Sequence, residues 1–235
     1  MNTQPALSNL PSATTPGRVQ PVMRLLLPVG WALTTVGYFG PWIAHQTAAL
    51  TLSGVDMGEF VKFLPSVVDG SLQVMRQFFY LPPIAVTVSI ALLGNRDELG
   101  YPRSLRALML LLALPISLQL LPPAWAPSTL LTAEFRLQTV ALALCWLLLA
   151  GSWALARLPS WLVGSLGTGL SLGALILPSW QLFVARPAIS ELFRVPPGIG
   201  WGFFLCLAGL AVTVAASTVI VPGSGARRLT LRIGE

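Results

Sequence analysis

Residues 200–221 read GWGFFLCLAGLAVTVAASTVIV and contain no charged side chain. A helix that crosses the hydrocarbon core of a bilayer needs about 20 mostly apolar residues, so this stretch is long enough to span a membrane. Five further apolar stretches precede it, at roughly 22–40, 76–94, 105–121, 136–156 and 161–178. We therefore predict an all-α fold, a polytopic bundle of six transmembrane helices over residues 22–221. Residues 1–21 are predicted to form a disordered cytoplasmic tail, and residues 222–235 a cytoplasmic C-terminal tail.

The overall composition supports the same prediction. Of the 235 residues, 54% are apolar and 9% are charged, whereas soluble domains carry about 25% charged residues. The net charge of +6 does not indicate nucleic-acid binding, because the basic residues flank apolar stretches and form no basic stripe. The lipid bilayer is the expected partner.

The distribution of charge predicts the orientation. The segments on the side of the two chain ends carry nine basic and three acidic residues, and the segments on the other side carry five of each. Lys and Arg are enriched in cytoplasmic loops, so both termini are expected in the cytoplasm, on the inner side of a cell inner membrane. Trp42, Trp125 and Trp180 follow the outer ends of the odd-numbered spans, where Trp often lies at the membrane interface.

The first outer segment, residues 41–77, is the most polar part of the chain. Ser53 is a candidate N-cap for an amphipathic helix that ends near Leu64, before Pro65, and lies in the membrane interface. Its apolar side is expected to consist of Val55, Phe60, Val61, Phe63 and Leu64. The candidate substrate-binding residues of this segment are His45, Asp56, Glu59, Lys62 and Arg76.

These residues have two interpretations. Asp56 and Glu59 would bind a cation or a polar head group, or the charged side chains would simply form the solvated face of an amphipathic helix. Arg76 is expected to reach the interface or to pair with Asp69. Similar pairs are expected between Arg136 and Glu134, and between Arg194 and Glu191.

Motifs for metal or nucleotide chemistry are absent from the sequence. It contains no His-Glu-x-x-His and no Gly-Lys-Ser/Thr phosphate loop. We therefore predict no catalytic residues, no metal and no cofactor; a single axial ligand for a haem or chlorophyll at His45 remains the alternative. Cys145 and Cys206 lie within apolar stretches and are expected to be buried.

A stripe of small residues is present in the fifth predicted span. Ser165, Gly169 and Gly173 recur every four residues, a spacing that lets a second helix approach closely. We predict a tight helix–helix contact here, either within the chain or with a partner subunit.

Two segments resemble a known group of proteins. Residues 40–45, GPWIAH, and 52–65, LSGVDMGEFVKFLP, are similar to multi-span inner-membrane proteins of Chloroflexus-like filamentous bacteria, a family with no known function. The resemblance implies a bacterial inner membrane and brings no site residue with it.

Three functions are compatible with the sequence. The first is a non-enzymatic subunit of a larger membrane complex, such as a transporter. The second is a self-contained carrier or channel that works through residues 41–77. The third is a lipid-modifying membrane enzyme with His45 and Glu59 as its acid–base pair.

Overall fold

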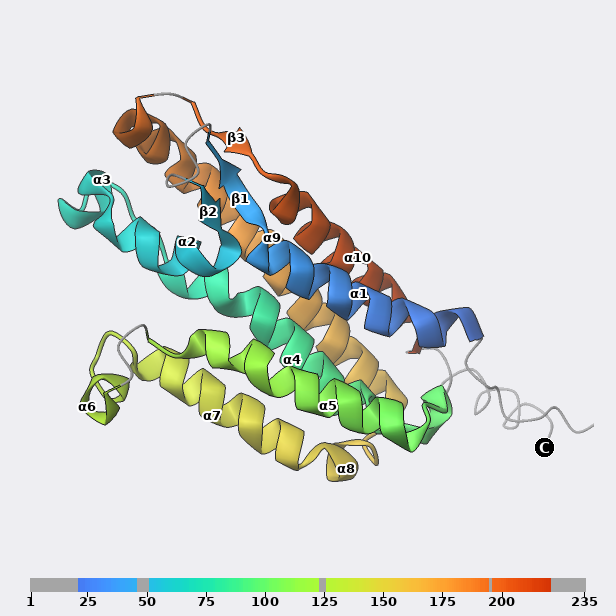
Figure 1. Cartoon of the computed structure of the whole chain (residues 1–235). Helices are drawn as coiled ribbons and strands as arrows, with labels where there is room; N and C mark the ends of the chain where they lie inside the picture. Colours follow the sequence, from blue (N-terminus) through green and yellow to red (C-terminus); the bar gives the residue numbers. More distant parts are fainter. Residues whose placement is uncertain (1–20, 46–50, 123–125, 195, 221–235) are drawn as a thin grey trace, which may run out of the picture.

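The computed structural model describes residues 21–45, 51–122, 126–194 and 196–220. Six long helices run side by side in this part of the chain (Figure 1). They are α1 (Pro21–Phe39), α4 (Leu81–Leu93), α5 (Arg103–Ser117), α7 (Arg136–Ala150), α9 (Ser160–Phe193) and α10 (Trp201–Ile220). The 3-10 turns η3 (Arg76–Tyr80) and η5 (Leu118–Leu120) extend α4 and α5. The predicted tails and Trp125 lie outside the described residues, apart from Pro21, which begins α1.

Short elements close the bundle at its two ends. One end, here called the cap end, carries α2 (Gly54–Phe60), η2 (Val61–Phe63), α3 (Pro65–Val68), α6 (Pro127–Leu130) and a small sheet (Figure 1). The other, the turn end, carries η4 (Asp97–Leu99) and α8 (Ser152–Leu155).

The mostly helical fold confirms the predicted class, and the helices match the six predicted stretches in position. Within the described residues, four are long and apolar enough to cross a membrane: 76–93, 103–120, 160–193 and 201–219. Helix α7 is a shorter apolar helix. Many large apolar side chains point outward, among them Leu111 and Leu147, which are 63% and 69% exposed. Such a surface suits lipid rather than water.

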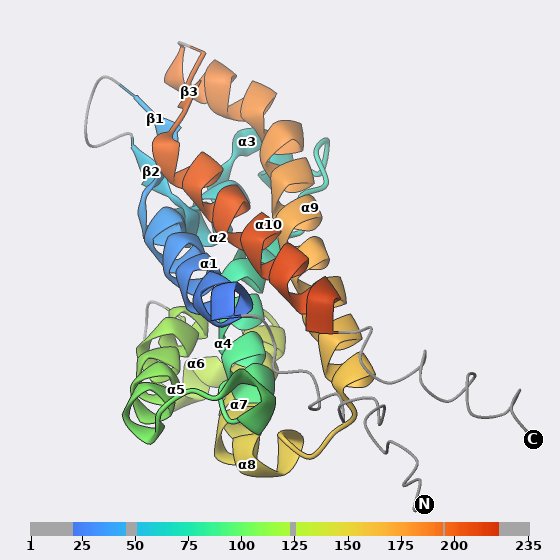
Figure 2. The ribbon, with the colours of Figure 1, turned by 90° about the vertical axis from the view of Figure 1, so that its right-hand side faces the viewer.

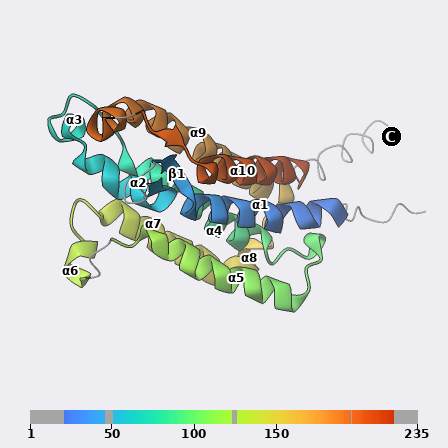
Figure 3. The same cartoon turned by 45° about the horizontal axis from the view of Figure 1, so that its top comes forward.

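Helix α4 lies at the centre of the bundle. Figure 3 shows α5 and α7 on one side of α4, and α9 and α10 on the other, with α1 beside it. Two clusters of buried side chains fill the interior. The cluster near the cap end includes Trp42, Phe79 and Phe203, and the cluster near the turn end includes Trp31, Leu93 and Val163.

The closest helix pair joins the first and the last long helix, which lie next to each other in Figure 2. A Cβ atom on Gly37 would collide with the backbone nitrogen of Cys206, and one on Gly209 would collide with the backbone nitrogen of Thr34. We call this contact the glycine seam. Its members are Gly30, Thr34, Gly37 and Gly40 on the α1 side, and Gly202, Cys206, Gly209 and Thr213 on α10. Glycine costs a helix about 1 kcal/mol relative to alanine, and the close backbone approach is what offsets that cost.

A three-stranded antiparallel sheet continues the seam at the cap end. Its strands are β1 (Pro41–Ala44), β2 (Leu52–Ser53) and β3 (Gly198–Ile199), in the order β2-β1-β3. Strand β1 directly follows α1 and β3 precedes α10, so the helix pair becomes a strand pair. The sequence did not indicate these strands, because each is only two to four residues long and the partner of β1 on one side, β3, is distant in the chain.

Helix α9 is longer than predicted. The expected span ended at residue 178, whereas the helix runs through Pro178 and Pro187 to Phe193. Its 34 residues correspond to about 51 Å at 1.5 Å per residue, well beyond a hydrocarbon core of about 30 Å. The segment that we expected to be an outer loop therefore continues the helix into the cap end.

The small-residue stripe of α9 does not make the intramolecular contact that we considered. Ser165 and Gly169 are exposed, and a Cβ on Gly169 or Gly173 would meet no described atom within 4 Å. The buried face of α9 consists instead of residues such as Val163, Gly167 and Ala174. The spacing was suitable, but the stripe faces away from the bundle.

The first predicted outer segment is folded onto the bundle. Trp42, expected at the interface, is 1% exposed, and its indole nitrogen donates to the Gly37 carbonyl at 3.1 Å. The helix predicted from Ser53 to Leu64 is present as α2 and η2. Its predicted apolar side is confirmed for Val55, Phe60, Val61 and Leu64, which pack into the core, and wrong for Phe63, which is 70% exposed. The buried face contains Gly54, Met57, Gly58, Val61 and Leu64, because its two glycines allow α2 to contact the Trp42 and Tyr80 rings closely.

The glycine seam gives a direct test. Gly209→Ala should lower the free energy of unfolding by about 1–3 kcal/mol, because the added methyl group forces two backbones apart. Gly169→Ala is the matched control on α9: its methyl group enters open space and alanine favours the helix, so its melting temperature should be unchanged or slightly higher. Thermal unfolding of the purified protein in detergent measures both, and equal behaviour of the two variants would contradict the seam.

Candidate functional site

A cluster of charged side chains lies at the cap end, where α2, η3 and the segment before α7 meet. Lys62 Nζ lies 2.7 Å from Glu59 Oε2 and 3.0 Å from Glu134 Oε1. Arg76 Nη1 lies 3.2 Å from an oxygen of each of the same two carboxylates. The Tyr80 hydroxyl donates to Glu59 Oε1 at 2.9 Å. We call Glu59, Lys62, Arg76, Tyr80 and Glu134 the charged cluster; it has two positive and two negative groups.

Arg76 is the least accessible ion of the cluster, with a side chain that is 10% exposed. Its Nη2 donates to the Glu134 carbonyl at 2.7 Å, and its guanidinium stacks on the Phe135 ring at 4.9 Å. A planar guanidinium can make all of these contacts at once. The predicted pair with Asp69 was wrong, since Asp69 accepts a hydrogen bond from the Ser71 backbone instead.

The structure brings together only part of the predicted site. Glu59 contacts both Lys62 and Arg76, a grouping that the sequence did not predict. Asp56, by contrast, caps the start of α2. Its carboxylate accepts hydrogen bonds from the backbone nitrogen and hydroxyl of Ser53, at 2.9 and 2.6 Å, while the Ser53 hydroxyl accepts from the Asp56 backbone. This capping box satisfies the free N–H groups of the helix start.

His45, at the end of β1, packs edge-on against Phe193 with ring centroids 5.5 Å apart. The carboxylate that we considered as its partner, Glu59, is held by Lys62, Arg76 and Tyr80.

Sequence reasoning missed two members, Glu134 and Tyr80. We expected Glu134 to pair with its neighbour Arg136, but it contacts Lys62 of η2 and Arg76 of η3, which lie much earlier in the chain. Local spacing favours short-range pairs and carries no information about a partner 72 residues away. Among the described residues, neither Arg136–Glu134 nor Arg194–Glu191 forms an ion pair.

The cluster favours the charged forms of Glu59 and Lys62. Partial burial by itself would raise the pKa of Glu59, but hydrogen bonds from Lys62 and Tyr80 outweigh it and hold that pKa below its usual value. Burial would lower the pKa of Lys62, and hydrogen bonds to Glu59 and Glu134 raise it instead. Glu59 is therefore ionised at neutral pH, a state that suits binding rather than proton donation.

A pocket of about 410 Å³ adjoins the cluster between α2, η3 and the end of α5 with η5. Its polar groups are Glu59, Tyr80 and Gln119, and Val55 and Leu118 contribute apolar walls. We call it the cap-end pocket. Its volume lies in the range of about 300–1,000 Å³ that is common for small-molecule sites.

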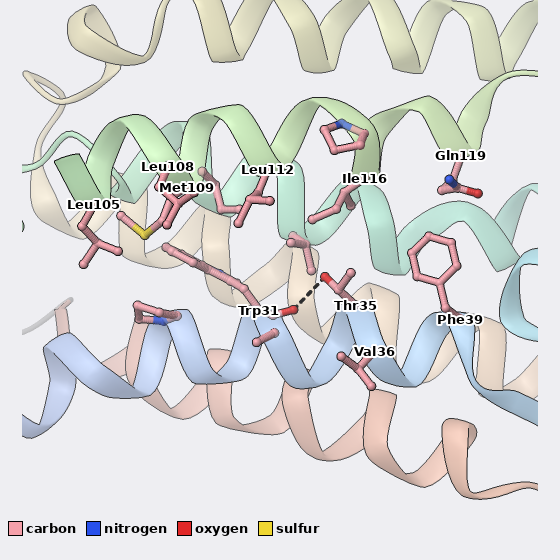
Figure 4. A pocket seen from close by; sticks show the side chains of 15 residues that line it. Trp31, Thr35, Val36, Phe39, Leu105, Leu108, Met109, Leu112, Ile116 and Gln119 are labelled. Carbon is pink, nitrogen blue, oxygen red and sulfur yellow. Dashed lines mark hydrogen bonds between the residues drawn. The ribbon is translucent and has the colours of Figure 1, made fainter. Parts of the chain in front are cut away.

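A second, apolar cavity of about 450 Å³ runs along the outside of the bundle between α1 and α5 (Figure 4). Val86 and Ile90 of α4 contribute to its lining, and Trp31, Leu105 and Leu112 lie along its length. We call it the lateral groove. Its rims are open, since Val36 and Leu112 are 53% and 51% exposed.

The two cavities share part of their walls. Pro115 and Gln119 line both the lateral groove and the cap-end pocket, and Gln119 stands at one end of the groove in Figure 4, opposite Leu105. The stretch from Leu105 to Gln119 covers about 21 Å at helical rise. The apolar lateral groove and the more polar cap-end pocket therefore adjoin at Pro115 and Gln119.

Among the described residues, no group of three His, Cys, Asp or Glu side chains could hold a metal ion. The two cysteines are buried and free, as expected. The chain matches no protein-family model, no curated protein and no solved structure.

The pKa of Glu59 predicts how stability depends on pH. The folded-state pKa of Glu59 is lowered. The Glu59 carboxylate therefore contributes fully to the free energy of unfolding above its unfolded-state pKa of about 4.3, and this contribution is lost as the pH falls through its folded-state pKa. Glu59→Gln should therefore lower the melting temperature at pH 7 and flatten its decline below about pH 4. Glu191→Gln, on an exposed position of α9, is the control and should follow the wild type. The prediction would be contradicted if the melting temperatures of the wild type and of Glu59→Gln fell in parallel as the pH decreases below about 4.

Proposed function

We propose that this chain is a six-span integral protein of a bacterial inner membrane, with both termini in the cytoplasm. The six long helices, their outward-facing apolar side chains and their alternating direction support the proposal. So does the distribution of charge among the described residues. The turn end carries Arg24, Arg96, Arg103, Arg106 and Arg157 against Asp97 and Glu98, whereas acidic and basic residues balance at the cap end.

Cysteine labelling tests this topology. Ser71 at the cap end and Asp97 at the turn end are both exposed, and the natural cysteines are buried. A membrane-impermeant maleimide should label Ser71→Cys in cells with a permeabilised outer envelope but an intact inner membrane. It should label Asp97→Cys only after the inner membrane is opened. Labelling of both in intact inner membranes, or the reverse pattern, would overturn the orientation.

Within this topology, we propose a non-enzymatic binding function: the protein holds an amphipathic molecule from the bilayer. The observation that carries the proposal is the wall shared by the lateral groove and the cap-end pocket. The groove opens sideways, where a hydrocarbon chain could enter from the lipid, and its length of about 21 Å exceeds half of a core of about 30 Å. An extended chain thus fits along it.

The polar end of this site indicates the kind of head group. Glu59, Tyr80 and Gln119 line the cap-end pocket, and an ionised carboxylate accepts hydrogen bonds only. A head group that donates hydrogen bonds, such as an amine or a hydroxyl, is therefore favoured. Lys62 and Arg76 fix the carboxylate in place, which lowers the conformational cost of binding.

A pair of leucine variants tests the binding site. Leu112→Trp should fill the lateral groove, whereas Leu144→Trp places the same bulk on the exposed face of α7; both leucines are 51% exposed. The probe is a photoreactive lipid with a diazirine in a single long chain and an amine in its head group. We expect cross-links to α1 and α5 in the wild type and in Leu144→Trp, and at least a several-fold loss in Leu112→Trp. Cross-links spread evenly over α7 and α5 would exclude a specific site.

A second proposal is membership in a larger membrane complex. It is supported by the stripe of Ser165, Gly169 and Gly173, which lies on the outward face of α9 and leaves room for a partner helix. Gly169→Leu should leave the folding of the chain intact and reduce the recovery of partner subunits in mild detergent. Recovery that is unchanged, or a wild-type protein that purifies alone, would contradict it.

A further inference from the structure

A third cavity, of about 580 Å³, lies at the turn end, between the α4–α5 connection and α8. We call it the turn-end pocket. Three arginines line it, Arg96, Arg106 and Arg157, together with Trp153, Asp97 and Glu98. It lies at the opposite end of the bundle from the charged cluster and shares no lining residue with the other two cavities.

Two of the arginines build its walls. Arg96 is 3% exposed and donates to the Leu158 carbonyl at 2.9 Å and to the Ser160 hydroxyl at 2.8 Å, besides its ion pair with Glu98. Arg106 is held by the carbonyls of Tyr101 and Asn95 and by Asp97. These bonds tie the α4–α5 connection to the start of α9 and give the pocket a fixed shape.

Arg157 differs from the other two. It is exposed, it stacks on the Trp153 ring at 4.8 Å, and no carboxylate in the described part of the chain forms an ion pair with it. Asp97 and Glu98 are already paired with Arg106 and Arg96. The pocket therefore has one uncompensated positive charge, on a guanidinium that the indole holds in place. In addition, the Nε of Arg96 is buried and has no hydrogen-bond partner in the described part of the structure.

We propose that the turn-end pocket binds the phosphate group of an anionic phospholipid. A guanidinium presents two parallel N–H groups that match phosphate oxygens, and basic pockets between helices on the cytoplasmic side suit acidic head groups. Trp153 is 61% exposed beside the pocket, as expected for a ring at the boundary between lipid and water. The lipid as the source of the phosphate rests on the proposed membrane embedding; the phosphate site itself does not.

Lipid retention by the full chain tests the proposal. The purified protein is mixed in detergent with phosphatidylglycerol or phosphatidylcholine, and native mass spectrometry and thermal unfolding report binding. Phosphatidylglycerol should be retained and raise the melting temperature. Arg157→Gln should weaken its binding about tenfold or more, and Arg157→Lys, which keeps the charge but loses the planar fork, should lie between. Without lipid, all variants should unfold as the wild type does, because Arg157 is exposed.

Arg103→Gln is the matched control, since Arg103 is exposed at the same end and does not line the pocket. It should retain phosphatidylglycerol like the wild type. Equal losses in Arg103→Gln and Arg157→Gln, or equal retention of the two lipids, would overturn the site. Inorganic phosphate that protects the protein as well as the lipid does, and only when Arg157 is present, would keep the phosphate site and overturn its lipid source.

Discussion

The glycine seam between α1 and α10 is the constraint on which the rest of the structure depends. Helices in lipid gain little from the hydrophobic effect between them, so close backbone packing has to hold them together. The seam brings the first and last long helices into contact, and the strands β1 and β3 prolong it. Because it fixes where the chain leaves α1, it also fixes Trp42 and, through that ring, the position of α2.

The placement of α2 in turn creates the charged cluster. Gly54 and Gly58 let the helix approach Trp42 and Tyr80, and this turns Glu59 toward Arg76 and Tyr80. Both cations and both carboxylates are then satisfied by one another, as partly buried charges require. Glu59 thereby becomes a fixed polar group in the wall of the cap-end pocket, next to an apolar groove along α5. Backbone packing thus leads stepwise to a cavity with a fixed carboxylate beside an apolar groove, the site for which we propose binding.

The two ends of the bundle differ in how far their charged side chains are paired with opposite charges. At the cap end, charges are balanced within the chain. At the turn end, Arg157 has a ring beneath it and no carboxylate among the described residues. A balanced cluster holds structure, whereas a surplus charge in a shaped pocket can attract an anion.

The sequence by itself determined the helical class, the positions of the six long helices and the Ser53 cap. Each of these follows from local information: apolar length or capping chemistry. Only the tertiary structure decided which small residues face inward. Gly30 and Gly37 are seven residues apart, as are Gly202 and Gly209, and these glycines form the helix contact. The four-residue repeat of small residues in α9 was the one we predicted to form a contact, yet it faces outward. The burial of Trp42, the length of α9 and the pairing of Glu134 with Arg76 likewise depend on partners far away in the chain, which periodicity along one helix cannot identify.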